Sequence, residues 1–176
     1  MGTYRKSNKK EIIELNYKMI SIIIVNYNVK SYFPSEPLEN TIDTPELSIA
    51  GASFYSDIES HITTLTIQSI LDEKILSIIY KNKYSWLENA LNMYLTTFYD
   101  SFGVSFKYDI LEKIKFNNLY DGYTYQVNAD ETICHKGDFF ILDNVIYNMN
   151  IKGSCDDMEL INQTYFLMKE NFEIIN

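Results

Sequence analysis

The chain has 176 residues, of which 46% are hydrophobic and 22% charged, and its formal net charge is −9. This length fits one domain with a sizeable core, and the composition excludes disorder along the whole chain. The acidic balance argues against a protein that coats nucleic acid, because such proteins neutralise phosphates with clustered lysine and arginine. We therefore expect a single domain over residues 1–176, with a short N-terminal helical extension over about residues 1–18.

The longest apolar run, Ile22 to Val25, is far shorter than the roughly 18 residues of a membrane span. The early segment "EIIELNYK" has two glutamates where a secretory signal would have its apolar stretch. As written, the sequence predicts a cytoplasmic protein. The alternative is a periplasmic or exported protein from which a signal was removed.

The first half of the chain predicts a weak helix followed by β structure. Residues 7–18 carry apolar residues among charges, and residues 19–33 are rich in β-branched and aromatic residues. Residues 35–45 have the composition of a linker. Residues 46–57 and 61–70 then predict the two strands of a hairpin.

The clearest helix is predicted from about Trp86 to Ser101. Ser85 and Glu88 form a capping-box pattern before it, and Gly103 follows where a left-handed C-cap belongs. Six apolar side chains fall on one stripe of this helix, which indicates a core face: Leu87, Ala90, Leu91, Tyr94, Leu95 and Phe98.

Alternating polar and apolar residues predict four strands after this helix, and Asp143-Asn144 suits a tight turn between the last two. A closing helix, capped by Ser154, is predicted from apolar residues at spacings of three and four. Clustered strands with helices on one or both faces indicate an α+β fold with one antiparallel sheet sandwiched by helices.

Several segments resemble PsbP-like proteins, including DcrB-like bacterial members. The segments are "FPSEPLENTIDTPELSIAGASFYS" (33–56), "ILEKIKFNNLYDGYTYQV" (110–127), "GDFFILDNVIYNMNIKG" (137–153) and "LINQTYFLMKENFEI" (160–174). The likeness covers roughly residues 25–175, and its value lies in the order and spacing of the segments. Residues 71–84 fit the family poorly, as an insertion or an extra strand.

The resemblance implies an antiparallel sheet sandwiched by helices that serves as a binding platform and not as an enzyme. The family includes the extrinsic subunit of the photosynthetic oxygen-evolving complex, a Ran-binding nucleotide release factor, periplasmic lipoproteins and chaperones of type VI secretion. No functional residue of the family carries over to a position of this chain.

The titratable residues predict no catalytic, cofactor or metal site. His61 opens a predicted strand and His135 lies in a predicted turn, and isolated histidines of this kind are usually surface residues. If the hairpin turns at Asp143-Asn144, Cys134 lies opposite residue 153 and close to Cys155. A disulfide and two free thiols are then both open, with free thiols favoured in the cytoplasm.

Three acidic pairs, Asp72-Glu73, Asp130-Glu131 and Asp156-Asp157, lack the spacing of a calcium loop and fit turns and helix caps. The surplus of tyrosine has two interpretations. The favoured one is that the rings fill and edge the core. The other is a sheet face that binds a partner through Tyr123, Tyr125, Phe139 and Tyr147.

We therefore predict a non-catalytic binding or adaptor protein with a protein partner, for example an accessory factor or chaperone of a bacterial secretion or injection system. An exported, lipoprotein-like envelope domain is one alternative, and a small-molecule binder or a hydrolase is another. A homodimer through an open sheet edge is also compatible with the pattern.

Overall fold

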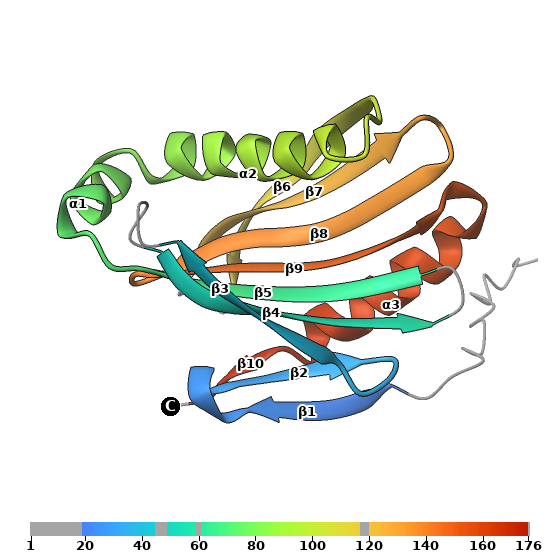
Figure 1. The fold of residues 1–176 in the computed structure, drawn as a ribbon, viewed down its shortest axis with the longest axis horizontal. Coiled ribbons are helices and arrows are strands. Elements are labelled where there is room, and N and C mark those ends of the chain that lie inside the picture. Colours follow the sequence, from blue (N-terminus) through green and yellow to red (C-terminus); the bar gives the residue numbers. More distant parts are fainter. Residues whose placement is uncertain (1–18, 45–48, 59–60, 117–119, 176) are drawn as a thin grey trace, which may run out of the picture.

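A computed structural model describes residues 19–44, 49–58, 61–116 and 120–175. It contains a seven-stranded sheet in the order β3-β4-β5-β9-β8-β7-β6 and a three-stranded sheet in the order β1-β2-β10. Every strand pair is antiparallel. The α+β prediction is therefore confirmed (Figure 1).

The small sheet begins with β1 (Ile20–Ile24) and β2 (Val29–Phe33), which a short 3-10 turn, η1 (Val25–Tyr27), connects. Asn28 ends the turn with φ at 51°, a left-handed value that asparagine tolerates better than most residues. The β structure predicted over residues 19–33 is confirmed, and this turn, which was not predicted, folds it into a hairpin.

The large sheet begins with β3 (Leu38–Thr44), β4 (Ile49–Ile58) and β5 (His61–Ile70). The predicted hairpin of β4 and β5 is confirmed by a continuous register. Residues 35–45, predicted as a linker, instead contain β3, which pairs along all seven of its residues with β4. The polar composition reflects the exposure of this edge strand.

Two helices follow, α1 (Glu73–Lys81) and α2 (Lys83–Asp100). Residues 71–84, expected as an insertion or an extra strand, are largely helical, and Asp72 caps α1 by accepting from the backbone N–H of Lys74. The predicted capping box was wrong, because α2 begins before Ser85. Gly103 does take a left-handed φ of 64° just after the helix.

The four predicted strands after α2 are confirmed as β6 (Phe106–Phe116), β7 (Tyr120–Ala129), β8 (Ile133–Leu142) and β9 (Val145–Ser154). The strands β8 and β9 are joined by the two residues Asp143 and Asn144, as expected.

The chain closes with a 3-10 turn, η3 (Cys155–Asp157), the helix α3 (Met158–Glu170) and the short strand β10 (Glu173–Ile174). Ser154 accepts from the backbone N–H of Asp156, so it caps the 3-10 turn that leads into α3. Strand β10 returns to pair with β2 and joins both ends of the described chain in the small sheet.

The two faces of the large sheet have different covers (Figure 1). The helices α1 and α2 bury one face with Leu87, Leu91, Leu95 and Tyr99. Helix α3 and the small sheet bury the other, where Phe33, Phe140, Met149 and Met168 meet. The expected single sheet layer was therefore wrong, since residues 20–33 leave it to form part of a second layer.

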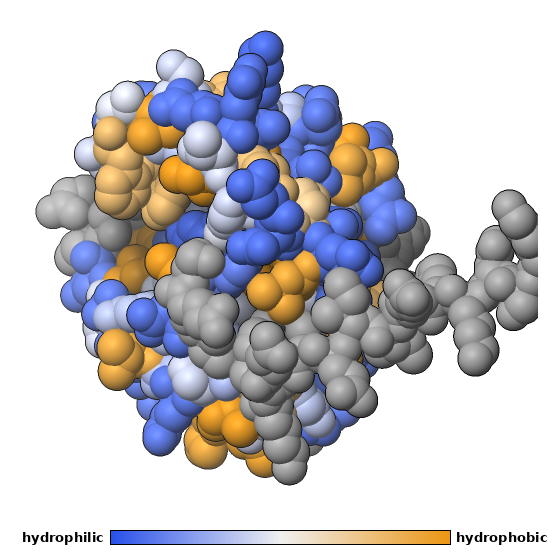
Figure 2. Space-filling model, turned by 90° about the vertical axis from the view of Figure 1, so that its right-hand side faces the viewer, coloured by the Kyte–Doolittle hydropathy of each residue, from blue (hydrophilic) through white to orange (hydrophobic). Residues whose placement is uncertain are grey.

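No helix among these residues has the length and apolar run that a membrane crossing requires. The predicted helix over residues 7–18 lies outside the described residues. Seen from the end of the molecule in Figure 2, apolar residues form separate patches between hydrophilic ones.

Candidate functional site

A groove of about 250 Å³ lies between the small sheet and the start of β3. We call it the β3 groove. Residues from β1, η1, the connection between the sheets, β3 and β4 line it: Ile22, Ile23, Ile24, Val25, Asn26, Glu36, Pro37, Glu39 and Phe54. It forms because the chain crosses from one sheet to the other at this place.

The β3 groove combines a buried aromatic side chain with exposed aliphatic residues. Phe54 is 5% exposed, and Tyr27 packs edge-on against it with ring centroids 6.0 Å apart. Ile23 and Val25 are 59% and 75% exposed. Two exposed aliphatic side chains beside an apolar floor are a surface that a partner can cover with a gain of hydrophobic free energy.

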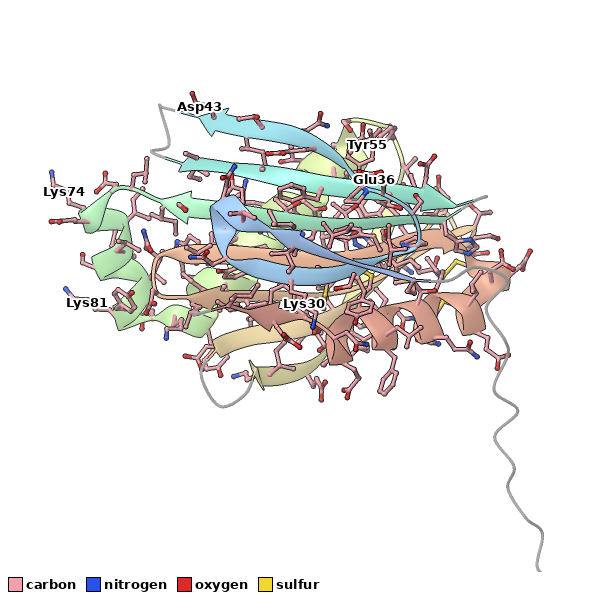
Figure 3. The ribbon with its side chains drawn as sticks, turned by 90° about the horizontal axis from the view of Figure 1, so that it is seen from below. Lys30, Glu36, Asp43, Tyr55, Lys74 and Lys81 are labelled. Carbon is pink, nitrogen blue, oxygen red and sulfur yellow. A yellow bond between two sulfur atoms is a disulfide. The ribbon has the colours of Figure 1, made fainter. Side chains whose placement is uncertain are left out.

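The charges at this site are acidic. Glu36 and Glu39 line the β3 groove, and Asp43 lies farther along β3, as Figure 3 shows for Glu36 and Asp43. All three are exposed, and no ion pair involves them among the described residues. Burial, followed by the charge of Glu39, raises the pKa of the nearby Tyr27 phenol. The site is therefore suited to a cationic group.

Strand β3 is an open edge of the large sheet. It pairs with β4 on one side, and no described strand pairs with its other side. Its register with β4 runs without a shift from Leu38 to Thr44. A regular edge strand with free backbone groups is a template on which another extended segment can pair.

A polar network is buried beneath α2. Tyr125 donates to Asn148 at 2.9 Å and lies 3.0 Å from Nε2 of His135, and the Tyr99 hydroxyl lies 3.3 Å from Nδ1. Since Tyr125 donates elsewhere, Nε2–H of a neutral His135 donates to it and Nδ1 accepts from Tyr99. Burial, and then the charge of Lys152, lowers the pKa of His135 well below 6.5.

Lys152 lies beside this network, because it pairs with His135 in the register of β8 and β9. Burial lowers the pKa of Lys152 to about 8, and its ammonium lies 3.9 Å from the ring centroid of Phe98. The hydrogen bonds of this network link α2 to β7, β8 and β9, although Asn148 Nδ2 has no hydrogen-bond partner among the described residues. A buried network of this kind stabilises the packing of α2.

A second buried network lies beneath α3. Asp138 is fully buried and accepts from Thr124 at 2.6 Å and from Tyr165 at 2.5 Å. Lys169 lies 3.5 Å from its other oxygen and 3.3 Å from Glu112 of β6. Burial raises the pKa of Asp138, and the charge of Lys169 opposes that shift. These contacts fasten α3 to the β6 side of the sheet.

The structure does not bring the four residues of the predicted partner-binding face together on an exposed surface. Tyr123, Tyr125 and Phe139 pack in the core beneath the helices α1 and α2, whereas Tyr147 belongs to the core on the opposite face. All four are at most 4% exposed. That hypothesis is corrected, and the core interpretation of these rings is the right one.

The histidines were expected at the surface, and this was also wrong. His135 lies within β8 at 0% exposure, and His61 begins β5 at 4%. Among the described residues, no group of three His, Cys, Asp or Glu side chains is arranged to hold a metal ion. Cys134 faces Gly153 across the hairpin, as the turn prediction required, and a disulfide joins it to Cys155.

The acidic pairs lie where turns and caps need them. Asp130 and Glu131 have positive φ values of 49° and 60° in the turn between β7 and β8. The β3 groove was not predicted from the sequence, because residues 35–45 were interpreted as a linker. The signal was the run Ile22–Ile24, in which the middle isoleucine has to point away from the core.

Comparison with known proteins places the fold. The chain is similar to the solution structure of cyanobacterial PsbP (CyanoP) from Synechocystis sp. PCC 6803, with a TM-score of 0.56 and 10% identity. The likeness covers 92% of this chain and 95% of that chain. No protein-family model and no curated protein matches the sequence. The chain has the PsbP-like fold.

Proposed function

We propose that this chain is a non-catalytic binding or adaptor protein that holds part of a protein partner at the β3 groove and along β3. One observation carries the proposal. The open, regular edge of β3 ends at a groove where Ile23 and Val25 are exposed beside the buried ring of Phe54. Backbone pairing and an apolar pocket together are what a sheet edge uses to bind an extended segment.

The more specific form of the proposal is an accessory factor or chaperone of a bacterial secretion or injection system. Support comes from the resemblance to PsbP-like proteins, which serve as binding platforms. The net charge of −9 also favours a basic or amphipathic partner.

Site-specific photo-crosslinking in the native host tests the proposal. A photoreactive phenylalanine analogue replaces Val25 in one variant and Met93 of α2 in the other. Both positions are strongly exposed apolar residues, at 75% and 67%, so they are matched. We expect one protein partner to be crosslinked at position 25 and not at position 93. Equal products from both positions, or none at position 25, would overturn the proposal.

The disulfide favours a second candidate function, an exported, lipoprotein-like envelope domain. Disulfides persist in oxidising compartments and are rare in the cytosol, and Cys134 and Cys155 are bonded here. Thiol labelling of the protein immediately after lysis of the native host, before and after reduction, tests this. Labelling only after reduction supports export, and labelling without reduction contradicts it.

A further inference from the structure

Resting on the proposed function, we infer that the partner segment is an extended, basic stretch that adds to the free edge of β3. It places two lysine or arginine side chains opposite Glu39 and Asp43 and an apolar side chain in the β3 groove. The partner is thereby identified by its chemistry as a cationic β-strand.

The first step is that β3 lacks several of the features by which proteins protect a sheet edge. Proteins protect sheet edges with lysines and other charged residues, with prolines and bulges, and by keeping the edge strand short. The charges of β3, Glu39 and Asp43, are both acidic, so they disfavour an acidic segment and not a basic one. Strand β3 has seven residues, "LENTIDT", with neither lysine nor proline, and a continuous register. The opposite edge, β6, carries lysines and has a register shift between Ile110 and Glu112. Of the two described edges of the large sheet, β3 is the one that can accept a strand along its whole length.

The second step is the spacing of the acids. Glu39 pairs with Phe54 and Asp43 with Ala50, so both acids point to the face that also bears the small sheet. They lie four residues apart, which is about 14 Å along an extended strand. Two residues that lie four positions apart in the added strand are therefore opposite the two acids. A lysine or arginine at each of these positions complements both charges.

The third step concerns the apolar β3 groove at the start of β3. Glu39 itself lines the β3 groove, beside Phe54 and across from Ile23 and Val25. An apolar side chain of the added strand near Glu39 reaches these residues, and its burial stabilises the complex. The groove thus fixes the position of the segment along β3.

A second copy of this chain is a poor occupant of the same edge. Antiparallel pairing of two β3 strands about Thr41 would place Glu39 of one copy opposite Asp43 of the other. Like charges directly opposite each other on a sheet are destabilising. The acidic edge therefore disfavours the homodimer and favours a basic partner.

Synthetic peptides test the inference on the full chain. The probe alternates valine and threonine and carries two lysines four positions apart, and the comparison peptide has glutamates at those positions. We expect the lysine peptide to bind and to shift the backbone amide resonances of Leu38–Thr44. Glu39→Gln with Asp43→Asn should weaken its binding about threefold to tenfold, as loss of two exposed ion pairs requires.

The matched control is Asp100→Asn with Asp109→Asn, which makes the same change of net charge on exposed residues away from β3. We expect it to leave binding unchanged. Equal binding of both peptides, an equal loss in both double variants, or shifts confined to β6 would overturn the inference. A partner crosslinked at position 25 would still uphold the proposed function in that case, so the two failures are distinguishable.

Discussion

The two edges of the large sheet use their charged residues differently. At the β6 edge, Glu112 pairs with Lys169 of α3, and the Lys113 ammonium lies 4.7 Å from the ring centroid of Tyr84. At the β3 edge, Glu39 and Asp43 have no ion-pair partner among the described residues. Glu112 and Lys113 of β6 therefore contribute contacts to the fold, whereas Glu39 and Asp43 of β3 are exposed to solvent.

The difference separates charges that stabilise the fold from charges that are open to a partner. Charges that fasten a helix to a sheet lower the free energy of the folded state, and removing them costs stability. Exposed charges without partners contribute little to folding but bring specificity and speed to association. Variants at the two edges should therefore separate loss of stability from loss of binding.

The largest effect is expected from Lys169→Met. The change removes the cation near the fully buried carboxylate of Asp138, and loss of one partner from a buried pair costs about 3 kcal/mol. Urea unfolding at pH 7 measures the loss. Because burial already raises the pKa of Asp138, protonation relieves the unpaired charge, and the loss should shrink as the pH falls.

The double variant Asp138→Asn with Lys169→Met provides the check. Without the buried charge, removal of the lysine should cost much less than in the parent chain. Equal costs of Lys169→Met in the two backgrounds would show that the pair does not fasten α3.

An intermediate effect is expected from acid. The pKa of His135 lies well below 6.5 in the folded chain, so below pH 6.5 the unfolded chain binds a proton that the folded chain does not. Stability should fall by up to about 1.4 kcal/mol per pH unit in this range. In His135→Gln this part of the slope should vanish. An unchanged slope in that variant would mean that other groups cause the acid sensitivity.

The smallest effect on stability is expected from the β3 acids. Glu39→Gln with Asp43→Asn changes two exposed side chains that form no ion pair with any described residue, so the free energy of unfolding should change by less than about 0.5 kcal/mol. Urea unfolding beside the peptide titration shows whether binding is lost without stability. A loss comparable with that of Lys169→Met would break the distinction between the two edges.

Much of the fold could be predicted from the sequence, because its elements are set by local patterns. The alternation in β7 and β9 and the apolar stripe of α2 gave the four-strand meander and the helix that covers it. Two short elements, β3 and η1, were not predicted. Strand β3 is an edge strand in which Leu38 and Ile42 are the only apolar residues, so it has the composition of a linker. The turn η1 folds residues 19–33 into a hairpin without a glycine or a proline that would mark it.

The candidate site was not predictable in the same way. The β3 groove depends on the crossing of the chain between two sheets. The run Ile22–Ile24 indicates an exposed isoleucine, but it does not indicate which strand lies beside that side chain. The buried position of His135 was missed for a related reason. Its neighbours "CHKG" have turn composition, but pairing with β7 and β9 on both sides overrides that local preference.

Amide hydrogen exchange of the full chain, with and without the partner recovered by crosslinking at position 25, tests the central claim most directly. Free edge amides of β3 should exchange readily in the unbound chain and slow markedly in the complex over Leu38–Thr44. The exchange of β6 over Phe106–Phe116 should stay the same. Protection of β6 or of α2 with no change in β3 would contradict the account.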